Sequence, residues 1–493
     1  MGIPADSFFL DPGATGTLQQ QIRQLVAGGI LSGRFHAGER MPSSRALARQ
    51  LGVSRITVTL AYTDLVADDY LTARGRSGYF VSDTAPEPRN RPPDPGPDAE
   101  STVDWSRVIG TRAAPITTKP ADWASYPYPF IYGQTDPALF DLGAWRLCAQ
   151  RALGRADFDA LTADQYDADD QQLVDFLTRQ TLPRRGITAS PDEILITLGA
   201  QNALWLSAEL LLTQRRTAAI EDPSYPPLRT ILSQTRCHMV TAEVDDDGLD
   251  PATIPEADVV YCTPSHQCPT TATMPLRRRR ALLDMAEARD FLIVEDDYDF
   301  EMSFIAPPLP ALKSLDRNGR VIYVGSFSKS IFPGLRLGYL VGPAPFIAEA
   351  RRLRASVLRH PPGLLQRTTA HFLSLGHYDS LIRRMSRALR SRREILDAAI
   401  AENGLTVAGR GVFGGSALWM AAPEGIDAAE LDLALRARGV LMEPGAPFFA
   451  DQTTSRFYRI AYSSIREDRI AAGIGLIAEE TRRLRSINEL PET

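Results

Sequence analysis

The chain has 493 residues, 44% of them hydrophobic and 23% charged, with a formal net charge of −6. This length exceeds one ordinary domain and can bury sizeable cores, so we expect at least two domains. The sequence has no run of about 18 apolar residues, and it does not begin like a signal peptide, which favours a cytoplasmic protein over a membrane protein. Its four cysteines form no CxxC pair, which argues against a disulfide framework and against a zinc site.

Residues 14–82 predict a small helical domain that begins with two helices. Apolar residues recur at helical spacing over 18–31. After a loop, Ser43 stands where it can cap a short helix that ends near Gly52, because a serine hydroxyl accepts a hydrogen bond from a free N–H group at a helix start.

A further helix follows at once, over 53–70, with Ser54 as its cap. Residues 71–82 then predict two short strands joined by a basic turn that contains glycine. Two helices, a turn, a helix and a two-stranded wing make a winged helix-turn-helix.

Charge placement in this domain favours DNA binding. Residues 1–82 contain eight arginines and six acidic residues, a balance of +2 within an acidic chain. Arg55 and Thr57 stand at the start of the second helix of the pair, the end that enters a major groove. The other predicted DNA-binding residues are the two cap serines and three arginines that can neutralise phosphates: Ser43, Ser54, Arg45, Arg74 and Arg76. Ordinary solvated surface is the alternative interpretation of these arginines.

The segment GERMPSSRALARQLGVSRITVTLAYTDL carries a family resemblance. With it, residues 18–82 resemble the DNA-binding domain of the GntR superfamily nearly from end to end. The resemblance implies that double-stranded operator DNA is a partner of this chain.

Residues 83–120 predict a linker. Its first part, residues 83–100, holds six prolines in eighteen residues and almost nothing apolar. Such a segment cannot form a core, so we expect it to be extended and semi-rigid.

Residues 121–486 predict an α/β domain in which short apolar strands alternate with helices. Strands of this kind are typical of a sheet that is largely buried. We expect a smaller α/β subdomain over about 380–484, and the arginine run at 277–280 predicts a solvated face rather than a second DNA contact. The predicted strands are 193–199, 218–222, 259–264, 291–297, 321–327 and 337–342.

Lys329, in GSFSKSIFPGLRLGY, has the setting of a reactive lysine. It follows a predicted strand and precedes a turn, and a lysine that attacks an aldehyde needs a rigid place that lowers its pKa. A single lysine after a strand is usually solvent-exposed, so the interpretation depends on its neighbours. Asp296 ends another predicted strand, where its carboxylate can pair with the ring nitrogen of pyridoxal phosphate, and Tyr298 can hydrogen-bond the ring hydroxyl. Taken alone, this acidic stretch is also consistent with a strand-end cap or a metal-binding cluster.

Further residues predict a cradle for the cofactor phosphate. Ser326 and Ser328 offer hydroxyl groups, and Arg336 offers a forked ion pair. A helix that begins near Ala200 and Gln201 offers free backbone N–H groups and its positive dipole end.

Tyr225, in EDPSYPPL, is a candidate to stack on the pyridine ring, with plain packing as the alternative. The order of these elements, GAQ, DPSY, TPSHQCPT, EDDYD, SFSK and R, resembles the type I aspartate-aminotransferase fold over about residues 126–484. Together with the N-terminal domain, TPSHQCPT, VEDDYDFE and GSFSKSIFPGLRLGYLVGP resemble the MocR/GabR family of transcription regulators over nearly the whole chain.

The resemblance implies pyridoxal 5'-phosphate as the cofactor and gives the residues roles. Lys329 is then the Schiff-base lysine, Asp296 the partner of the ring nitrogen and Tyr298 a neighbour of the ring hydroxyl, with Arg336 and the two serines at the phosphate. Arg459, in RFYRIAYSS, is then the residue that clamps the acid group of an effector, and its forked geometry suits a carboxylate or a sulfonate. The resemblance also implies a domain-swapped homodimer, in which each winged helix crosses to the partner's aminotransferase-like domain.

Two positions depart from the Asn-Pro-Thr-Gly pattern of aminotransferases. Cys268 stands at the Asn position, where it cannot make the same bond to the ring hydroxyl, and Thr271 stands at the Gly position. Either His266 or Gln267 substitutes for the missing Asn, or the ring electronics differ from those of a good transaminase.

We expect a DNA-binding regulator, without enzymatic turnover as its role, that senses an amino compound by forming an external aldimine with the cofactor. It would control genes for the uptake or catabolism of that compound. The candidates are taurine, gamma-aminobutyrate, a diaminobutyrate-type product of ectoine breakdown, D-alanine and pyridoxal phosphate itself. A working aminotransferase with an accessory DNA-binding domain is the alternative, and a cofactor-free interaction module is a third hypothesis.

Overall fold

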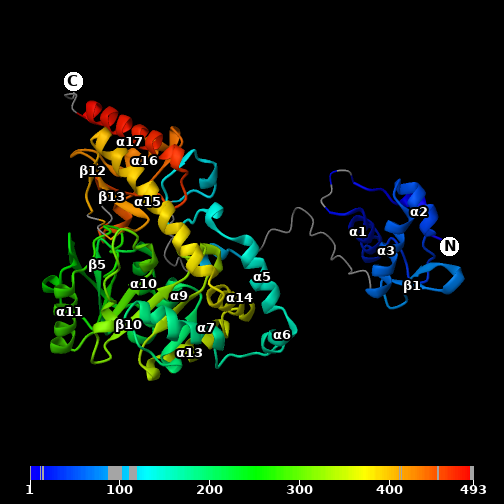
Figure 1. The fold of residues 1–493 in the computed structure, drawn as a ribbon, viewed down its shortest axis with the longest axis horizontal. Helices are drawn as coiled ribbons and strands as arrows, with labels where there is room; N and C mark the ends of the chain where they lie inside the picture. Colours follow the sequence, from blue (N-terminus) through cyan, green and yellow to red (C-terminus); the bar gives the residue numbers. More distant parts are fainter. Residues whose placement is uncertain are drawn as a thin grey trace. The chain divides into compact units, whose positions relative to one another are not determined.

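A computed structural model describes residues 2–11, 13, 16–86, 103–109, 119–409, 411, 413–451 and 455–488. The chain divides into two compact units, residues 1–111 and residues 112–493 (Figure 1). Much of the predicted linker, residues 87–102 and 110–118, lies outside the described residues. Within the described ranges, no helix combines the length and the apolar character needed to cross a membrane.

The N-terminal unit is the predicted winged helix-turn-helix. Both predicted caps are confirmed: the Ser43 hydroxyl accepts a hydrogen bond from Ala46 N at 3.2 Å, and the Ser54 hydroxyl accepts one from Thr57 N at 3.1 Å. Phe8, which precedes the predicted start of the domain, is buried in the same core. The helices are α1 (Leu18–Leu31), α2 (Ser44–Leu51) and α3 (Arg55–Ala67), and the wing pairs β1 (Leu71–Ala73) with β2 (Tyr79–Val81).

The C-terminal unit is built on an eight-stranded sheet. Each of the six predicted strands is present within two residues of its predicted bounds. Five central strands, β10, β9, β8, β5 and β6, run parallel, whereas β11 and β7 run antiparallel to their neighbours. In spatial order the strands are β4 (Ile194–Thr197), β11 (Gly338–Val341), β10 (Val321–Ser326), β9 (Leu292–Asp297), β8 (Val259–Cys262), β5 (Thr217–Asp222), β6 (His238–Asp245) and β7 (Gly248–Leu249).

Helices cover both faces of this sheet (Figure 1). Consecutive strand residues point to opposite faces, so Ile293 and Val294 of β9 enter two different cores. Burial on both faces explains why the strands are apolar throughout instead of alternating with polar residues. One face packs against α9 (Ala200–Leu211), α10 (Pro226–Thr235) and α13 (Ala344–Leu358), and the other against α11 (Leu276–Arg289) and α12 (Leu312–Leu315).

The predicted C-terminal subdomain contains a four-stranded sheet, in the order β12 (Thr406–Val407), β13 (Ala417–Ala421), β16 (Phe457–Ala461) and β15 (Glu443–Pro444). Its helices are α15 (His377–Asn403), α16 (Ala428–Ala437) and α17 (Glu467–Asn488). Among the described residues, the remaining α-helices are α4 (Trp105–Val108), α5 (Leu142–Ala152), α6 (Arg155–Thr162), α7 (Gln171–Phe176), α8 (Leu182–Arg184) and α14 (Gly363–Ser374).

A short strand that the sequence did not predict, near the start of this unit, pairs with a strand of the C-terminal subdomain. β3 (Tyr128–Pro129) pairs in parallel with β14 (Val440–Leu441), and Phe130 N donates a hydrogen bond to Leu441 O at 2.9 Å. The chain that follows the linker is therefore built into the C-terminal subdomain.

The prediction of a solvated face at 277–280 is wrong for one member. Arg279 is fully buried, because its guanidinium donates to the backbone oxygens of Met274, Pro264 and Pro310 at 2.8 to 2.9 Å. Three carbonyl acceptors thus satisfy a charge that the sequence pattern assigns to solvent.

Two adjacent glycines of α1 provide a matched stability test. A methyl group on Gly28 would meet nothing within 4 Å, whereas one on Gly29 would lie 2.2 Å from Cε2 of the buried Phe35 ring. Gly28→Ala should stabilise the N-terminal unit by about 0.5–1 kcal/mol through helix propensity. Gly29→Ala should destabilise it by about 1–3 kcal/mol, because the ring has to move. Hydrogen exchange of the α1 amides in the full chain measures both changes, and changes of equal sign would contradict the packing.

Candidate cofactor and effector site

Polar side chains from several elements line a cavity of about 380 Å³ in the C-terminal unit. β9 and β10 are parallel neighbours, with Asp297 opposite Gly325, so their carboxyl ends bring Asp296, Ser326 and the following loop to one edge of the sheet. Nine of the ten predicted cofactor residues and Arg459 are in the lining, and their roles stay predictions. The lining residues are Lys119, Tyr132, Gly133, Ala200, Gln201, Tyr225, Cys268, Asp296, Tyr298, Ser326, Ser328, Lys329, Arg336, Glu443 and Arg459.

Lys329 shares the ring of Tyr132 with a second cation. The Lys329 Nζ atom and the Arg459 Cζ atom each lie 4.2 Å from the centroid of that ring. Burial, and then the charge of Arg459, lower the pKa of Lys329 to about 8. The neutral, nucleophilic amine is therefore more populated at neutral pH than in an ordinary lysine.

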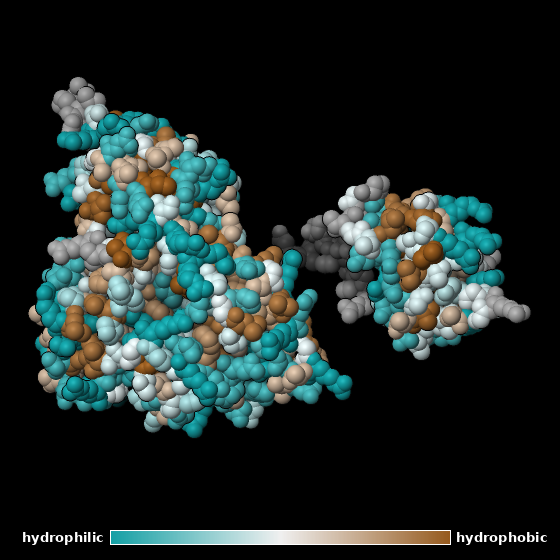
Figure 2. All heavy atoms as spheres, viewed as in Figure 1, coloured by the Kyte–Doolittle hydropathy of each residue, from teal (hydrophilic) through white to brown (hydrophobic). Residues whose placement is uncertain are grey.

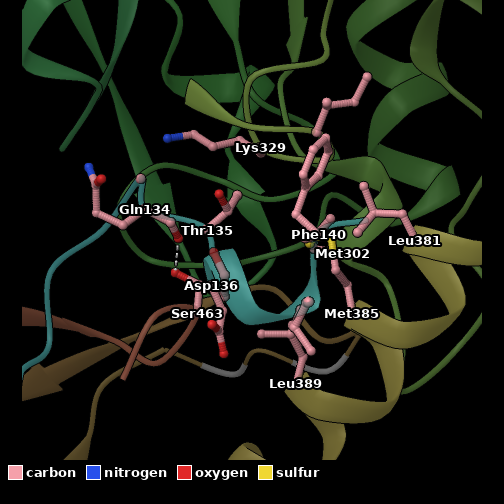
Figure 3. Close-up of a pocket in the computed structure, with 14 residues that line it drawn as sticks. Gln134, Thr135, Asp136, Phe140, Met302, Lys329, Leu381, Met385, Leu389 and Ser463 are labelled. Carbon is pink, nitrogen blue, oxygen red and sulfur yellow. Dashed lines mark hydrogen bonds between the residues drawn. The ribbon is translucent and has the colours of Figure 1, made fainter. Parts of the chain in front are cut away.

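Figure 3 shows what lies behind this lysine. Leu381, Met385 and Leu389 of α15 help to line a second, small cavity, and the amine of Lys329 points away from them. Ser463 Oγ donates to Gln134 O at 2.6 Å on the same wall. An apolar wall thus lies behind the lysine stem, while the amine faces the polar cavity.

The absence of a side chain at Gly133 leaves space for the amine of Lys329. Its φ is +83°, in the left-handed region, and a Cβ atom there would lie 2.8 Å from Lys329 Nζ. A side chain would both strain the backbone and displace the amine. Gly133 and Tyr132 were missed by the sequence analysis, since no motif marks the IYGQ stretch.

Asp296 presents an unsatisfied carboxylate oxygen. Its Oδ1 atom is buried and has no hydrogen-bond partner among the described residues. Burial, and then the charges of Asp297 and Asp299, raise the pKa of Asp296 to about 8. Asp297 also has a buried Oδ1 atom without a partner, but its Oδ2 atom accepts hydrogen bonds from Arg185 Nε and from the Tyr323 hydroxyl, both at 2.7 Å. A buried acceptor without a donor is costly, so Asp296 is suited to a ligand N–H group.

Donors for an anion gather at the start of α9. A Cβ atom on Gly199, the residue before the helix, would lie 3.5 Å from Arg336 Nη2 and 3.6 Å from Ser328 Oγ. Ala200 and Gln201 are the first two residues of α9, so their N–H groups have no acceptor within the helix. Positive charge, a hydroxyl and free N–H groups together form the kind of cradle that binds phosphate.

The residues expected near the ring hydroxyl are placed differently from one another. Tyr298 lines the cavity, and its hydroxyl donates to His266 O at 3.0 Å. His266 lies behind the wall, 3% exposed, with its Nδ1 atom 2.8 Å from Asp299 Oδ1. Gln267 is also occupied, because its amide donates to Pro223 O at 2.7 Å. The structure therefore brings Cys268 and Tyr298 to the cavity, rather than either residue expected to replace the Asn.

Thr271 adopts the backbone conformation that a glycine favours. Its φ is +64°, which is strained for a β-branched residue. Its hydroxyl oxygen is buried without a hydrogen-bond partner in the described part of the chain. The departure from glycine noted in the sequence thus has a structural cost at this turn.

Arg459 is held by a carboxylate that the sequence analysis missed. Its Nε atom donates to Glu443 Oε2 at 2.8 Å, and its Nη1 atom lies 3.6 Å from Cys268 Sγ. Although burial opposes it, the charge of Glu443 keeps the pKa of Arg459 above its usual value. Tyr132 N also donates to Glu443 Oε2, at 3.3 Å. The guanidinium therefore has one edge occupied, and its two terminal nitrogens face toward Cys268 and the cavity.

The predicted DNA-binding residues lie at the starts of α2 and α3 and in the wing of the N-terminal unit. Arg45 and Arg55 are exposed, and Arg55 Nε donates to Ser44 Oγ at 3.3 Å. The Thr57 hydroxyl is bonded to the Ser54 hydroxyl at 2.8 Å, so it serves the cap. Arg74 stacks over the Phe80 ring at 4.8 Å in the wing. The side chain of Arg76 lies outside the described part of the structure.

Two family models match this chain. Residues 18–81 match the model described as bacterial regulatory proteins of the gntR family. Residues 139–475 match the model described as aminotransferase class I and II.

Similar curated proteins are transcriptional regulators. The chain is 58% identical to the HTH-type transcriptional regulator TauR of Rhodobacter capsulatus, over 98% of this chain and all of that one. It is 33% identical to the pyridoxine biosynthesis regulator PdxR of Corynebacterium glutamicum, over 78% of each. It is 31% identical to the probable rhizopine catabolism regulatory protein MocR of Rhizobium meliloti, over 79% of this chain and 78% of that one.

Similar solved structures are aminotransferases. The kynurenine aminotransferase of Pyrococcus horikoshii superposes with a TM-score of 0.69 at 25% identity, over 77% of this chain and 98% of that one. The alpha-aminoadipate aminotransferase LysN of Thermus thermophilus gives the same TM-score at 26% identity, over 78% of this chain and 100% of that one.

The lowered pKa of Lys329 can be measured directly, because the chain contains only two other lysines, Lys119 and Lys313. We expect reductive methylation of cofactor-free protein by formaldehyde to show a pH midpoint near 8 for Lys329. In Arg459→Gln, the midpoint should move upward, because a repelling cation is lost and Glu443 is left unpaired. Mass spectrometry of the labelled peptides gives all three profiles, with Lys313 as the internal reference. A midpoint for Lys329 above about 10, as in a solvated lysine, would contradict the electrostatics of the cavity.

Proposed function

This chain belongs to the MocR/GabR-type transcriptional regulators, in which a GntR-type helix-turn-helix domain is joined to an aminotransferase class I/II domain, and we propose that it senses an amino compound through pyridoxal phosphate. As a regulator, it would use the aminotransferase-like domain for detection rather than for turnover. The genes under its control would serve uptake or catabolism of the sensed compound. We also propose the domain bounds 14–82, 83–120 and 121–486, and a domain-swapped homodimer.

The residues of the cavity fit the cofactor. The orphaned Asp296 oxygen suits a protonated ring nitrogen, and the cradle at the start of α9 suits a phosphate. When bound, pyridoxal phosphate supplies an aldehyde that condenses with primary amines. Lys329 would hold that aldehyde until an amino compound displaces it, and its low pKa supports this role.

The Arg459–Glu443 pair supports an effector with a single acid group. The terminal nitrogens of Arg459, one of which also lies 3.6 Å from Cys268 Sγ, can bind one carboxylate or sulfonate, while the Glu443 charge beside them would repel a second anion. Taurine heads the candidates, because the name of the regulator TauR, which is 58% identical, suggests control related to taurine. Gamma-aminobutyrate has the same pattern of one amine and one acid group. Diaminobutyrate-type compounds, D-alanine and pyridoxal phosphate itself remain in the test panel.

The test of this function is DNA binding measured together with the cofactor absorbance. With DNA from upstream of its own gene and the neighbouring genes, one compound of an amino acid and amino sulfonate panel should change both readouts. Lys329→Ala should lose both responses, whereas Lys313→Ala, whose amine is paired with Asp316 at 3.1 Å, should keep them. Turnover of compounds to keto products with indifferent DNA binding would favour the enzyme hypothesis, and absence of a cofactor band would favour the interaction module.

Arg459→Gln should weaken the effector response selectively. Loss of a charged hydrogen-bonding partner costs about 1.5–3 kcal/mol, or roughly ten- to a hundredfold in effector concentration. The matched control is Arg456→Gln, an exposed arginine just before β16. The half-maximal effector concentration in the DNA-binding assay measures both variants, and an equal shift in both would refute the role of Arg459.

Two arginines of the N-terminal unit should differ in what they contribute to DNA binding. If Arg55 contacts base edges, Arg55→Ala should cost about 1–3 kcal/mol on the specific site and little on random DNA. Arg74→Ala should weaken binding to both kinds of DNA alike, because a phosphate contact carries no sequence information. Affinities on the two DNAs at one salt concentration measure the difference, and equal losses for Arg55→Ala would refute its assignment.

A further inference from the structure

Two exposed apolar side chains, Ile56 and Leu60, form a stripe on the outward face of α3. Ile56 is 72% exposed and Leu60 is 48% exposed, and both lie opposite the buried face formed by Val58 and Leu65. Hydrophobic side chains are also visible among hydrophilic ones on the surface of this unit in Figure 2. A helix with one face in the core normally presents polar side chains on the other face. We therefore ask which binding partner would contact the apolar stripe.

The threonines along this stripe have already used their hydroxyl groups. Thr59 Oγ1 donates to Arg55 O, and Thr63 Oγ1 donates to Thr59 O, both at 2.9 Å. Donors bound to the helix's own carbonyls are not free for a partner. The threonine hydroxyls therefore have no donor left for a partner, and methyl groups make up much of what Ile56, Leu60 and these threonines present.

Positive charge surrounds the beginning of the stripe. Arg55 precedes Ile56 and is exposed, and Arg45 and Arg49 are exposed on α2. The carboxylates near the end of α3 are already paired, because Asp64 accepts from Gln19 and Asp68, the residue after the helix, pairs with Arg23. An apolar protein surface would gain little from this rim of arginines, whereas a polyanion with accessible methyl groups would complement both features.

We propose that Ile56 and Leu60 recognise thymine methyl groups in the major groove of the operator. Among the groups that base pairs present there, the thymine C5-methyl is the apolar one, and apolar side chains pack against it. The inference rests on the proposed DNA-binding function and adds base composition to it. The operator should carry a thymine beside the base that Arg55 contacts, because residues 55 and 56 are neighbours at the helix start.

Uracil substitution tests this inference without changing base pairing. Sites would first be selected from random duplexes with the full-length, cofactor-loaded protein. Each thymine in the selected site would then be replaced by deoxyuridine, which removes only the methyl group from the major groove. We expect one or two positions in each half-site to lose about three- to fivefold in affinity, the effect of one buried methyl group, and the other positions to change little.

A double-mutant cycle tests whether Ile56 is the side chain that contacts the thymine methyl group. In Ile56→Ala, replacement of the critical thymine should have no further effect, because its contact is already gone. Leu31→Ala, which truncates a 39%-exposed leucine at the end of α1, should keep the wild-type response to uracil. Because Ile56 is exposed, Ile56→Ala should leave the N-terminal unit folded, and hydrogen exchange of the α3 amides checks this.

The outcomes separate this inference from the proposed function. Selection of no sequence by the wild-type protein would overturn both. Specific binding without any thymine that is sensitive to uracil, or sensitivity that persists in Ile56→Ala and Leu60→Ala, would overturn the inference alone. If the two variants instead changed the oligomeric state of the protein at equal DNA affinity, the stripe would be a contact between copies of this chain, and the inference would be wrong.

Discussion

Two cations buried against one tyrosine ring set the main constraint on the C-terminal unit. Lys329 and Arg459 each lie 4.2 Å from the centre of the Tyr132 ring, and like charges in a poorly solvated place repel strongly. The protein reduces this repulsion in two ways: Glu443 neutralises Arg459 at 2.8 Å, and Lys329 gives up its proton more readily. Burial, together with the nearby positive charge of Arg459, thus makes the neutral form of the Lys329 amine easier to reach.

Asp296, Asp297 and Asp299 stand close together in the sequence, but their carboxylates meet different partners. Asp296 and Asp297 are adjacent on β9, so the pleat directs them to opposite faces of the sheet. Asp297 meets the buried Arg185, and Asp299, in the following turn, meets His266. Asp296 and Asp297 each keep a buried Oδ1 atom without a donor among the described residues, but the other oxygen of Asp297 accepts from Arg185 and Tyr323. Burial, and then the charges of the two paired carboxylates, raise the pKa of Asp296 and favour its protonated form.

Local features were predictable from the sequence, and long-range ones were not. The caps Ser43 and Ser54 and the six apolar strands depend on signals within a few residues, and all were predicted closely. Tyr132 and Glu443 are 311 residues apart, and the hydrogen bond between them leaves no local pattern in either segment. The burial of Arg279 was equally hidden, because its acceptors are backbone oxygens supplied by the fold. Of the ten predicted cofactor residues, His266 was misplaced relative to the cavity wall, since a motif gives the neighbourhood of a residue but not the direction of its side chain.

The chain that leads from the linker into the C-terminal unit forms part of the cavity wall. Lys119, Tyr132 and Gly133 line the cavity, and β3, between them, is tied to the C-terminal subdomain through β14. The cavity wall and the anchorage of the linker in the C-terminal unit are therefore one continuous piece of backbone. Under the proposed sensing function, a ligand that moved Tyr132 would also move this anchorage directly, without a path through the eight-stranded sheet.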